Sequence, residues 1–471
     1  MFRRRDLMVI GGGAGGLVVA SVAARLGVRV TLVDKGPKLG GDCLHSGCVP
    51  SKTLIDAAAA AHRIRAAGGL GLHVGDLQVD MAGVNARIRS VVERIQEHDD
   101  PERLRGYGCE VLFGTARFTS PHEVEVNGQR IRARRFVIAT GSRPRIPDIE
   151  GLREAGYLTN EDMFTLPALP ARLAVLGAGP VGLELGQAMA RLGSAVSVLE
   201  QGPQVLPRED PELSAQLVEC LEAEGLNVMT GMRVQRVRRA GDVRVLECAD
   251  GRRVEVDAVL VAVGRRPNVE DLGLETAGVA YGAGGIQVDR RMRTGERHIY
   301  AVGDVCGPYA FTHVAEYQAG IVLSNAVFRW PRRADYRVIP RVTYTDPELA
   351  HVGLTEQQAR ERGTGVAVYR FPFSSVDRAL TRNQGYGQVK LVARRGRLVG
   401  ASVLGPAAGE LIHELVLAMQ ARIKISAIAG AVHAYPTLSQ IHRLAINAGY
   451  AERLFRPWLR AVVRCMNRVL P

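Results

Sequence analysis

The chain has 471 residues, enough for two to four domains, and its 46% hydrophobic content includes no apolar run near the length of a membrane span. A net charge of +13 would suit a nucleic-acid binder, but only five of the 61 basic residues are lysines and no basic–aromatic module accompanies them. We therefore expect no nucleic-acid binding. The basic first residues lack the apolar stretch of a signal peptide and most cysteines are scattered, so we expect a cytoplasmic protein.

The first recognisable unit is a strand, a glycine loop, a helix and a second strand. Residues 6–10 predict a buried strand, an alanine-rich helix runs to Gly27, and residues 28–33 predict a strand that ends at Asp34. In this context the loop G-x-G-x-x-G indicates dinucleotide binding, because its glycines let the backbone approach a pyrophosphate and the helix N-terminus stabilises the charge. Asp34 is placed to bond a ribose hydroxyl. The three glycines of the loop are Gly11, Gly13 and Gly16.

Two cysteines follow at close spacing. Cys43 and Cys48 lie among glycines at the start of a predicted helix over residues 52–61, with Lys52 one turn further in. A helix N-terminus stabilises a thiolate, which is the reactive form of cysteine. No metal site is expected, because no second Cys/His pair follows at ligand spacing. We interpret the pair as a redox-active disulfide/dithiol rather than as two buried apolar side chains.

The run Gly-Gly-Asp-Cys-Leu-His-Ser-Gly-Cys-Val-Pro-Ser-Lys over residues 40–52 resembles the active-site signature of the class I pyridine nucleotide–disulfide oxidoreductases. Dihydrolipoamide dehydrogenase, glutathione reductase and mercuric reductase belong to that family. The resemblance implies that Cys48 is the thiol beside a flavin and that Cys43 attacks the substrate. It also implies that Lys52 lies near flavin N5, paired with Glu184.

A second dinucleotide-binding motif follows the same order. A predicted strand over residues 173–176 leads into a glycine loop that starts at Gly177, and a second predicted strand over residues 195–199 ends at Glu200. Residues 136–144 and 259–267 form a further pair of similar stretches, so one dinucleotide domain interrupts the other. By resemblance, the first domain binds FAD and the second a nicotinamide dinucleotide. The resemblance adds these cofactor-binding residues: Gly114, Ala139, Thr140, Gly141 and Asp304 for FAD, and Gly177, Gly179, Gly182, Glu200 and Gly264 in the second domain.

The expected fold class is α/β, with two Rossmann-like dinucleotide-binding domains, one inserted in the other, and a C-terminal α+β dimerisation domain. The homodimer is implied by the resemblance. The expected segments are the first part of the FAD domain (1–146), the NAD domain (147–275), the return of the FAD domain (276–335), the dimer-interface domain (336–450) and a basic amphipathic helix (451–471).

The dimerisation region departs from the family's pattern. There the family carries His-Pro-Thr-x-x-Glu, whose histidine is a base held by the glutamate, but here Tyr435 and Gln440 occupy those two positions. A phenol with a pKa of about 10 is a poor base near neutral pH. His45, between the cysteines, and then His433 are the candidates to replace the missing base, and each has a structural role as its alternative.

These features predict a homodimeric enzyme that passes electrons from NADH through FAD to the Cys43–Cys48 disulfide and on to a small-molecule acceptor. Tyr435 favours a mercuric-reductase-like acceptor or another small oxidant, although Cys465 lacks the adjacent cysteine that mercuric reductases use. Dihydrolipoamide dehydrogenase activity, quinone reduction at the flavin and a flavin redox sensor are the alternatives. Glu200 would repel a 2′-phosphate, so NADH is preferred over NADPH, unless Arg233 or Arg236 reaches that phosphate.

The end of the chain repeats apolar residues at helical spacing from residue 450, interleaved with arginines. One interpretation is a helix packed on its own domain. The other is a helix that contacts a membrane surface or a partner, which would place the protein at the inner face of the membrane.

Overall fold

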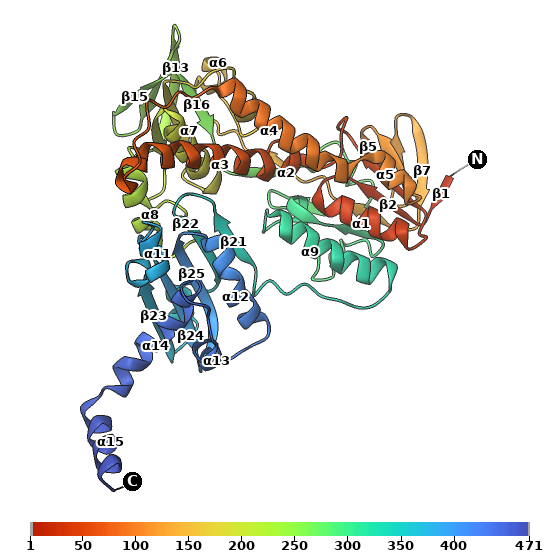
Figure 1. The fold of residues 1–471 in the computed structure, drawn as a ribbon. Helices are drawn as coiled ribbons and strands as arrows, with labels where there is room; N and C mark the ends of the chain where they lie inside the picture. The colour runs from red at the N-terminus through yellow and green to blue at the C-terminus, as the bar shows by residue number, and fades with distance from the viewer. Residues whose placement is uncertain (1–2, 470–471) are drawn as a thin grey trace. The chain divides into compact units, whose positions relative to one another are not determined.

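The computed structural model describes residues 3–469. The chain forms two compact units. The first comprises residues up to 177, with 191–194 and 234–335, and the second comprises residues 178–190, 195–233 and those from 336 onward. Each unit is described by itself, and Figure 1 shows the ribbon with its elements labelled.

The first unit is built around a five-stranded sheet with strand order β20-β8-β2-β3-β4. All of its neighbouring strands run parallel, and their mostly buried side chains agree with the continuous apolar runs in the sequence. β20 pairs with β8 although more than a hundred residues separate them, so the intervening segment is an insertion, as predicted. The strands are β2 (Leu7–Ile10), β3 (Val30–Asp34), β4 (Glu110–Phe113), β8 (Phe136–Ile138) and β20 (Ile299–Ala301).

Two helices of the first unit, α1 (Ala14–Arg25) and α9 (Thr312–Val322), run close together on one side of this sheet (Figure 1). A Cβ on Gly15 would lie 3.0 Å from the side chain of Val302, so glycine permits the close approach of α1 to the residue that follows β20. Four short strands form a second sheet of order β1-β7-β6-β5, and the turn between β6 and β7 has Asn127 and Gly128 at positive φ. These strands are β1 (Arg3–Arg5), β5 (Ala116–Ser120), β6 (Glu123–Val126) and β7 (Gln129–Ala133).

The second dinucleotide-binding motif has the predicted strands and a helix after its glycine loop. β10 (Arg172–Leu176) pairs in parallel with β16 (Ala258–Val261), and β11 (Ala195–Leu199) pairs in parallel with β12 (Asn227–Met229). Helix α7 (Pro180–Leu192) follows the glycine loop. The two similar stretches identified in the sequence meet in space, because β9 (Ser142–Pro144) and β17 (Arg265–Pro267) pair antiparallel.

The second unit contains a five-stranded antiparallel sheet of order β21-β22-β25-β24-β23. Its core joins the sheet to helices α12 (Ala408–Gln420) and α14 (Gln440–Leu454). This arrangement is the predicted α+β domain. The strands are β21 (Pro340–Thr343), β22 (Glu348–Gly353), β23 (Val366–Pro372), β24 (Gln388–Arg394) and β25 (Arg397–Gly405).

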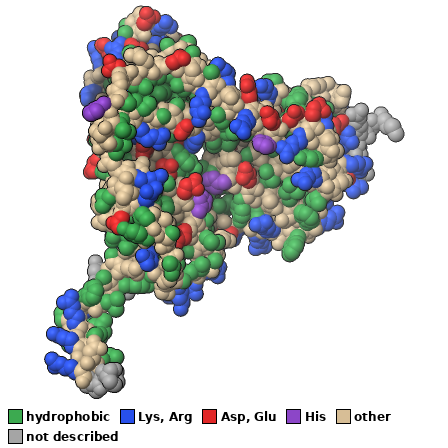
Figure 2. All heavy atoms as spheres, viewed as in Figure 1, with side chains coloured by type: hydrophobic (Ala, Val, Ile, Leu, Met, Phe, Trp, Pro, Cys, Tyr) green, Lys and Arg blue, Asp and Glu red, His purple; other side chains and the backbone are tan. Residues whose placement is uncertain are grey.

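The helical pattern predicted from residue 450 onward is divided between two helices. α14 ends at Leu454 and α15 spans Pro457–Val469. The break precedes Pro457, because proline has no N–H and its ring disfavours helical backbone at the preceding residue. Figure 2 shows apolar and basic side chains along the last helix. Within residues 3–469, no helix has both the length and the apolar character needed to cross a membrane.

Candidate active site

The first glycine loop adopts a backbone that only glycine fits. Gly11 has φ of 106°, and a Cβ there would lie 2.2 Å from the carbonyl oxygen of Ala139. A Cβ on Gly16 would lie 1.9 Å from the carbonyl oxygen of Gly11. Helix α1 begins immediately after the loop, at Ala14. The loop can therefore present backbone N–H groups at a helix N-terminus, which fits a dinucleotide pyrophosphate.

Each glycine loop is held by the acid that ends the following strand. Asp34 accepts hydrogen bonds from the amides of Gly12 at 2.6 Å and Gly36 at 2.7 Å. In the second copy Glu200 accepts them in the same pattern, from Ala178 at 2.9 Å and Gly202 at 2.7 Å. The two acids thus occupy equivalent places beside their loops, where each could also bond a ribose hydroxyl.

The remaining predicted FAD contacts gather at the carboxyl ends of the parallel strands. The Gly114 amide bonds the carbonyl of Asp34 at 2.8 Å, and the Ala139 amide bonds that of Ile10 at 2.7 Å. The Thr140 hydroxyl bonds the carbonyl of Asn268 at 2.7 Å. Ligands of such sheets bind at this edge, so the arrangement fits FAD. Gly141 and Asp304 follow β8 and β20 at the same edge.

Around the predicted nicotinamide loop, a Cβ on Gly177 would lie 2.7 Å from the carbonyl oxygen of Ala262. Gly179 and Gly264 would each meet no atom within 4 Å, which leaves open space at both positions. Gly182 is buried in the first turn of α7.

The two cysteines lie on consecutive short segments, Cys43 in α2 (Gly41–His45) and Cys48 at the first position of α3 (Cys48–Arg65). Cys43 is half-buried and Cys48 is exposed. The hydroxyl of Thr312 donates a hydrogen bond to Cys43 Sγ at 3.0 Å and lies 3.5 Å from Cys48 Sγ. The bond with Cys48, together with burial, raises the pKa of the Cys43 thiol, while the bond from Thr312 lowers it.

Three other predicted residues have defined surroundings. Lys52 lies one turn into α3, which begins earlier than the predicted helix. Glu184 is buried in α7 and accepts a hydrogen bond from the amide of Tyr344 at 2.9 Å. The pairing of Lys52 with Glu184 stays a prediction. His45 lies with Nε2 at 2.8 Å from the carbonyl oxygen of Leu39, a contact that gives this ring a structural partner.

Arg265 connects the cysteine loop to Asp304. Its guanidinium lies 2.9 Å from an oxygen of Asp42, the residue before Cys43, and 3.7 Å from an oxygen of Asp304. The hydroxyl of Ser142 donates to Asp304 at 2.6 Å. Burial raises the pKa of Asp304, and the bond from Ser142 and the charge of Arg265 oppose that rise. Arg265 therefore balances two carboxylates beside the redox pair.

In the dimerisation region, the hydroxyl of the exposed Tyr435 donates a hydrogen bond to Asp377 at 2.9 Å. This bond to a carboxylate raises the pKa of the phenol. Two residues earlier, His433 Nε2 lies 3.2 Å from Glu414 Oε1. The other oxygen of Glu414 lies 2.8 Å from Nδ1 of the buried His442. Burial acts to raise the pKa of Glu414, but its contacts with His442 and His433 outweigh burial and lower it.

Four residues beside these predicted sites were not identified from the sequence as functional: Asp42, Arg265, Thr312 and Glu414. Asp42 and Arg265 lie inside motifs that were recognised in the sequence. Their charge at those positions could have identified them as candidate site residues. Thr312 and Glu414 stand in helices with no motif of their own. Only their positions in the fold reveal them.

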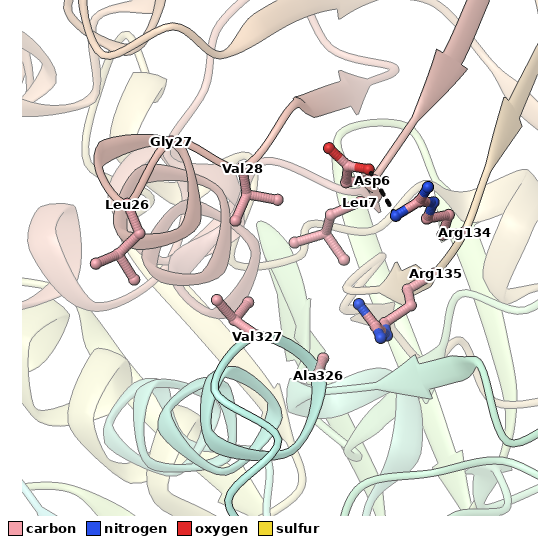
Figure 3. Close-up of a pocket in the computed structure, with 9 residues that line it drawn as sticks. All are labelled: Asp6, Leu7, Leu26, Gly27, Val28, Arg134, Arg135, Ala326 and Val327. Carbon is pink, nitrogen blue, oxygen red and sulfur yellow. Dashed lines mark ion pairs between the residues drawn. The ribbon is translucent and has the colours of Figure 1, made fainter.

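A separate recess of about 270 Å³ lies in the first unit, next to the amino end of β2 (Figure 3). Asp6 and Arg134 form an ion pair on its wall at 3.6 Å. Because cofactors of parallel sheets bind at the carboxyl edge, this recess is not part of the candidate active site. Its lining consists of Asp6, Leu7, Leu26, Gly27, Val28, Arg134, Arg135, Ala326 and Val327.

Family comparisons agree with this geometry. Residues 5–319 match the model of the pyridine nucleotide-disulphide oxidoreductases, and residues 339–445 match the dimerisation domain of the same enzymes. The chain belongs to the pyridine nucleotide–disulphide oxidoreductase family. It is therefore an FAD-dependent oxidoreductase that uses NAD(P)H, and its dimerisation domain supports a homodimer.

Similar proteins include a dihydrolipoyl dehydrogenase from Thermus scotoductus, 41% identical over 94% of this chain and 98% of the relative. A mercuric reductase from Staphylococcus aureus is 35% identical over 93% of this chain and 81% of the relative. Among solved structures, the Cu(II) complex of the HOCl-induced flavoprotein disulfide reductase RclA from Escherichia coli superposes with a TM-score of 0.86. It is 28% identical and covers 94% of this chain and 99% of the other. These similarities establish the flavoprotein disulfide oxidoreductase class.

Proposed function

We propose that this protein uses NADH to reduce a small acceptor at the Cys43–Cys48 pair, and that the acceptor is a soft metal ion held by external thiols, such as Hg²⁺. The observation that carries the proposal is the cysteine pair combined with Tyr435, whose phenol is bonded to Asp377 and is a poor proton carrier for a disulfide substrate. A metal acceptor needs no protonated thiol leaving group.

Bound FAD and NADH would supply the two-electron transfer that converts the Cys43–Cys48 disulfide to a dithiol. The chain holds these groups through its two glycine loops and their acids, Asp34 and Glu200. For Hg²⁺ bound to two external thiolates, one NADH and one proton yield NAD⁺, Hg⁰ and two thiols. The protein's part is to favour thiolate on the cysteine pair: Cys48 stands at the N-terminus of α3, and Thr312 donates a hydrogen bond to Cys43.

A second candidate is dihydrolipoamide dehydrogenase-type activity, which the His433–Glu414 contact favours. A histidine held by a carboxylate is the kind of acid–base pair that disulfide exchange requires. In this chain His433 lies two positions before Tyr435. Its imidazole would therefore approach a substrate from a different place than a histidine at position 435. The soft-metal proposal ranks first because the residue at the family's base position is tyrosine.

The preferred reductant is NADH and the expected location is the cytoplasm, where NADH and reduced thiols are present. Glu200 supports NADH, because its carboxylate lies beside the second glycine loop and would repel a 2′-phosphate.

The test is an acceptor screen with the purified, FAD-loaded protein. We expect NADH oxidation to be fastest with Hg²⁺ in excess thiol and slow with lipoamide or glutathione disulfide. In the reverse direction, NAD⁺ reduction by dihydrolipoamide should also be slow. C43S should abolish metal reduction and leave direct quinone reduction at the flavin intact. C465S, which changes an exposed cysteine elsewhere, is the matched control and should retain all activity. Faster turnover with dihydrolipoamide or lipoamide than with Hg²⁺ would overturn the proposal.

A further inference from the structure

Helix α15 presents an amphipathic surface that is exposed in the described structure. Trp458 is 62% exposed and Met466 is 52% exposed, values unusual for large apolar side chains. Leu454 and Phe455, just before the helix, are exposed as well. This exposure does not agree with the interpretation of a helix packed on its own domain.

The helix separates its large apolar residues from its arginines. At about 100° per residue, the large apolar side chains of residues 458–466 fall within an arc of roughly 140°. The arginines follow an i, i+4 row on the opposite side, and no acidic residue occurs after Glu452. The large apolar residues of this arc are Trp458, Leu459, Val462, Val463 and Met466, and the arginines are Arg460, Arg464 and Arg468.

We propose that α15 binds an anionic membrane surface and lies in its plane. The apolar arc would enter the boundary between headgroups and acyl chains, and the arginines would contact lipid phosphates. Trp458 suits that boundary, because its indole combines an apolar body with a polar N–H. The proposal does not depend on which acceptor the enzyme reduces.

Charge complementarity selects this occupant over a second copy of the same helix. Two copies of α15 would bring six arginines together without a single acidic side chain from residues 457–469. A surface of anionic lipids supplies the missing negative charge instead. Zwitterionic lipids offer the apolar boundary without the net charge, so they should bind the helix weakly.

The first experiment sediments the full-length, FAD-loaded protein with vesicles. We expect binding to phosphatidylcholine–phosphatidylglycerol vesicles, little binding to phosphatidylcholine alone, and weaker binding at high salt. R460Q combined with R464Q should weaken binding to the anionic vesicles by roughly tenfold or more, because each arginine near such a surface contributes on the order of 1 kcal/mol. Equal sedimentation with neutral and anionic vesicles would overturn the proposal.

A matched pair of charge changes tests the apolar arc. V462E places a carboxylate in its middle, whereas A461E adds the same charge outside it on the neighbouring exposed position. We expect V462E to reduce binding about tenfold more than A461E, with FAD content unchanged in both. Equal vesicle binding by the two variants would show that the apolar arc does not enter the membrane. If the wild type does not bind vesicles and V462E dissociates the dimer, the arc instead contacts the second subunit.

Fluorescence locates the helix directly. The chain has two tryptophans, so W330F leaves Trp458 as the only indole. Its emission should shift to the blue on anionic vesicles and return when salt releases the protein. An emission maximum that does not move while the protein sediments would assign the binding to another part of the chain.

Discussion

The hydroxyl of Thr312 donates a hydrogen bond to Cys43 Sγ at 3.0 Å, although 269 positions separate the two residues in the chain. Thr312 opens helix α9, which follows β20 in the first unit. The same hydroxyl lies 3.5 Å from Cys48 Sγ. The single hydroxyl proton of Thr312 is directed at Cys43 and stabilises negative charge on its sulfur, so we infer that Thr312 tunes the reactivity of Cys43.

Replacing Thr312 by valine should raise the pKa of the Cys43 thiol further, because the bond from Thr312 opposes the effects of Cys48 and burial. In T312V the fraction of thiolate at neutral pH should fall by roughly ten- to a hundredfold, the effect of one lost hydrogen bond to a charged group. The measurement is the rate of iodoacetamide alkylation of the reduced enzyme against pH. T312S keeps the hydroxyl and should retain the wild-type profile, whereas an unchanged profile in T312V would contradict the assignment.

The cysteine pair should give a spectroscopic signature of a thiolate beside the oxidised flavin. Two-electron reduction of the wild-type enzyme should produce a long-wavelength charge-transfer band, and C48S should lose this band while retaining FAD. The assignment rests on the place of Cys48 at the start of α3, where the helix terminus stabilises a thiolate. If C48S keeps the band and C43S loses it, Cys43 would be the thiolate beside the flavin and Cys48 the thiol that attacks the substrate.

The contact between His433 and Glu414 predicts that His433 carries protons for disulfide or dithiol substrates, but not for a metal acceptor. H433Q should lower dihydrolipoamide or lipoamide turnover by roughly ten- to a hundredfold, within the usual range for acid–base assistance. Reduction of Hg²⁺ should change little in the same variant. E414Q tests the positioning of the ring, because it removes the charge next to His433. Equal losses with metal and disulfide acceptors in H433Q would indicate a structural role.

Coenzyme preference should depend on Glu200. In E200A the ratio of kcat/KM for NADH over NADPH should fall by roughly tenfold, because the carboxylate that repels a 2′-phosphate is removed. Arg236 is paired with Glu150 at 2.5 Å, which leaves the exposed Arg233 as the residue to test for NADPH use. R233A should reduce NADPH turnover more than NADH turnover if the enzyme uses both. Faster turnover of the wild type with NADPH would contradict the role of Glu200.

The second unit contains a buried lysine whose removal should be costly. Lys390 Nζ lies 2.8 Å from Asp210 Oδ2 and 2.9 Å from Glu212 Oε2, and Asp210 is 2% exposed. K390M would leave a buried carboxylate without its partner and should destabilise the protein by about 3–5 kcal/mol. The measurement is the free energy of unfolding in urea. K424M, at an exposed lysine, is the control and should remain within about 0.5 kcal/mol of the wild type.

The same cluster predicts a loss of stability in acid. Burial acts to raise the pKa of Glu356, but hydrogen bonds from Arg360 and Lys390 lower it to about 2. A carboxylate with a lowered folded-state pKa stabilises the fold above its unfolded pKa of about 4.3, and this contribution disappears as the pH falls toward 2. Unfolding measured between pH 5 and pH 2 should therefore show a smaller decline in K390M than in the wild type.

Much of the fold could be predicted because its signals are local. The strand, glycine loop, helix and acid of each dinucleotide-binding motif lie within about 30 consecutive residues. The backbone that they form requires glycine at positions such as Gly11. The cysteine pair was predictable for the same reason. The insertion of one domain in the other followed from the repeat, and the pairing of β8 with β20 agrees with it.

The surroundings of the reactive groups could not be predicted, because they join segments that are far apart in the chain. No local pattern relates Thr312 to Cys43, or Arg265 to Asp42. Tyr435 and Gln440 indicated a missing acid–base pair, yet the carboxylate next to His433 comes from another helix. Residue type and spacing determine which backbone can form and which chemistry is available, whereas hydrogen bonds that tune a thiol or hold a histidine depend on how helices pack against sheets.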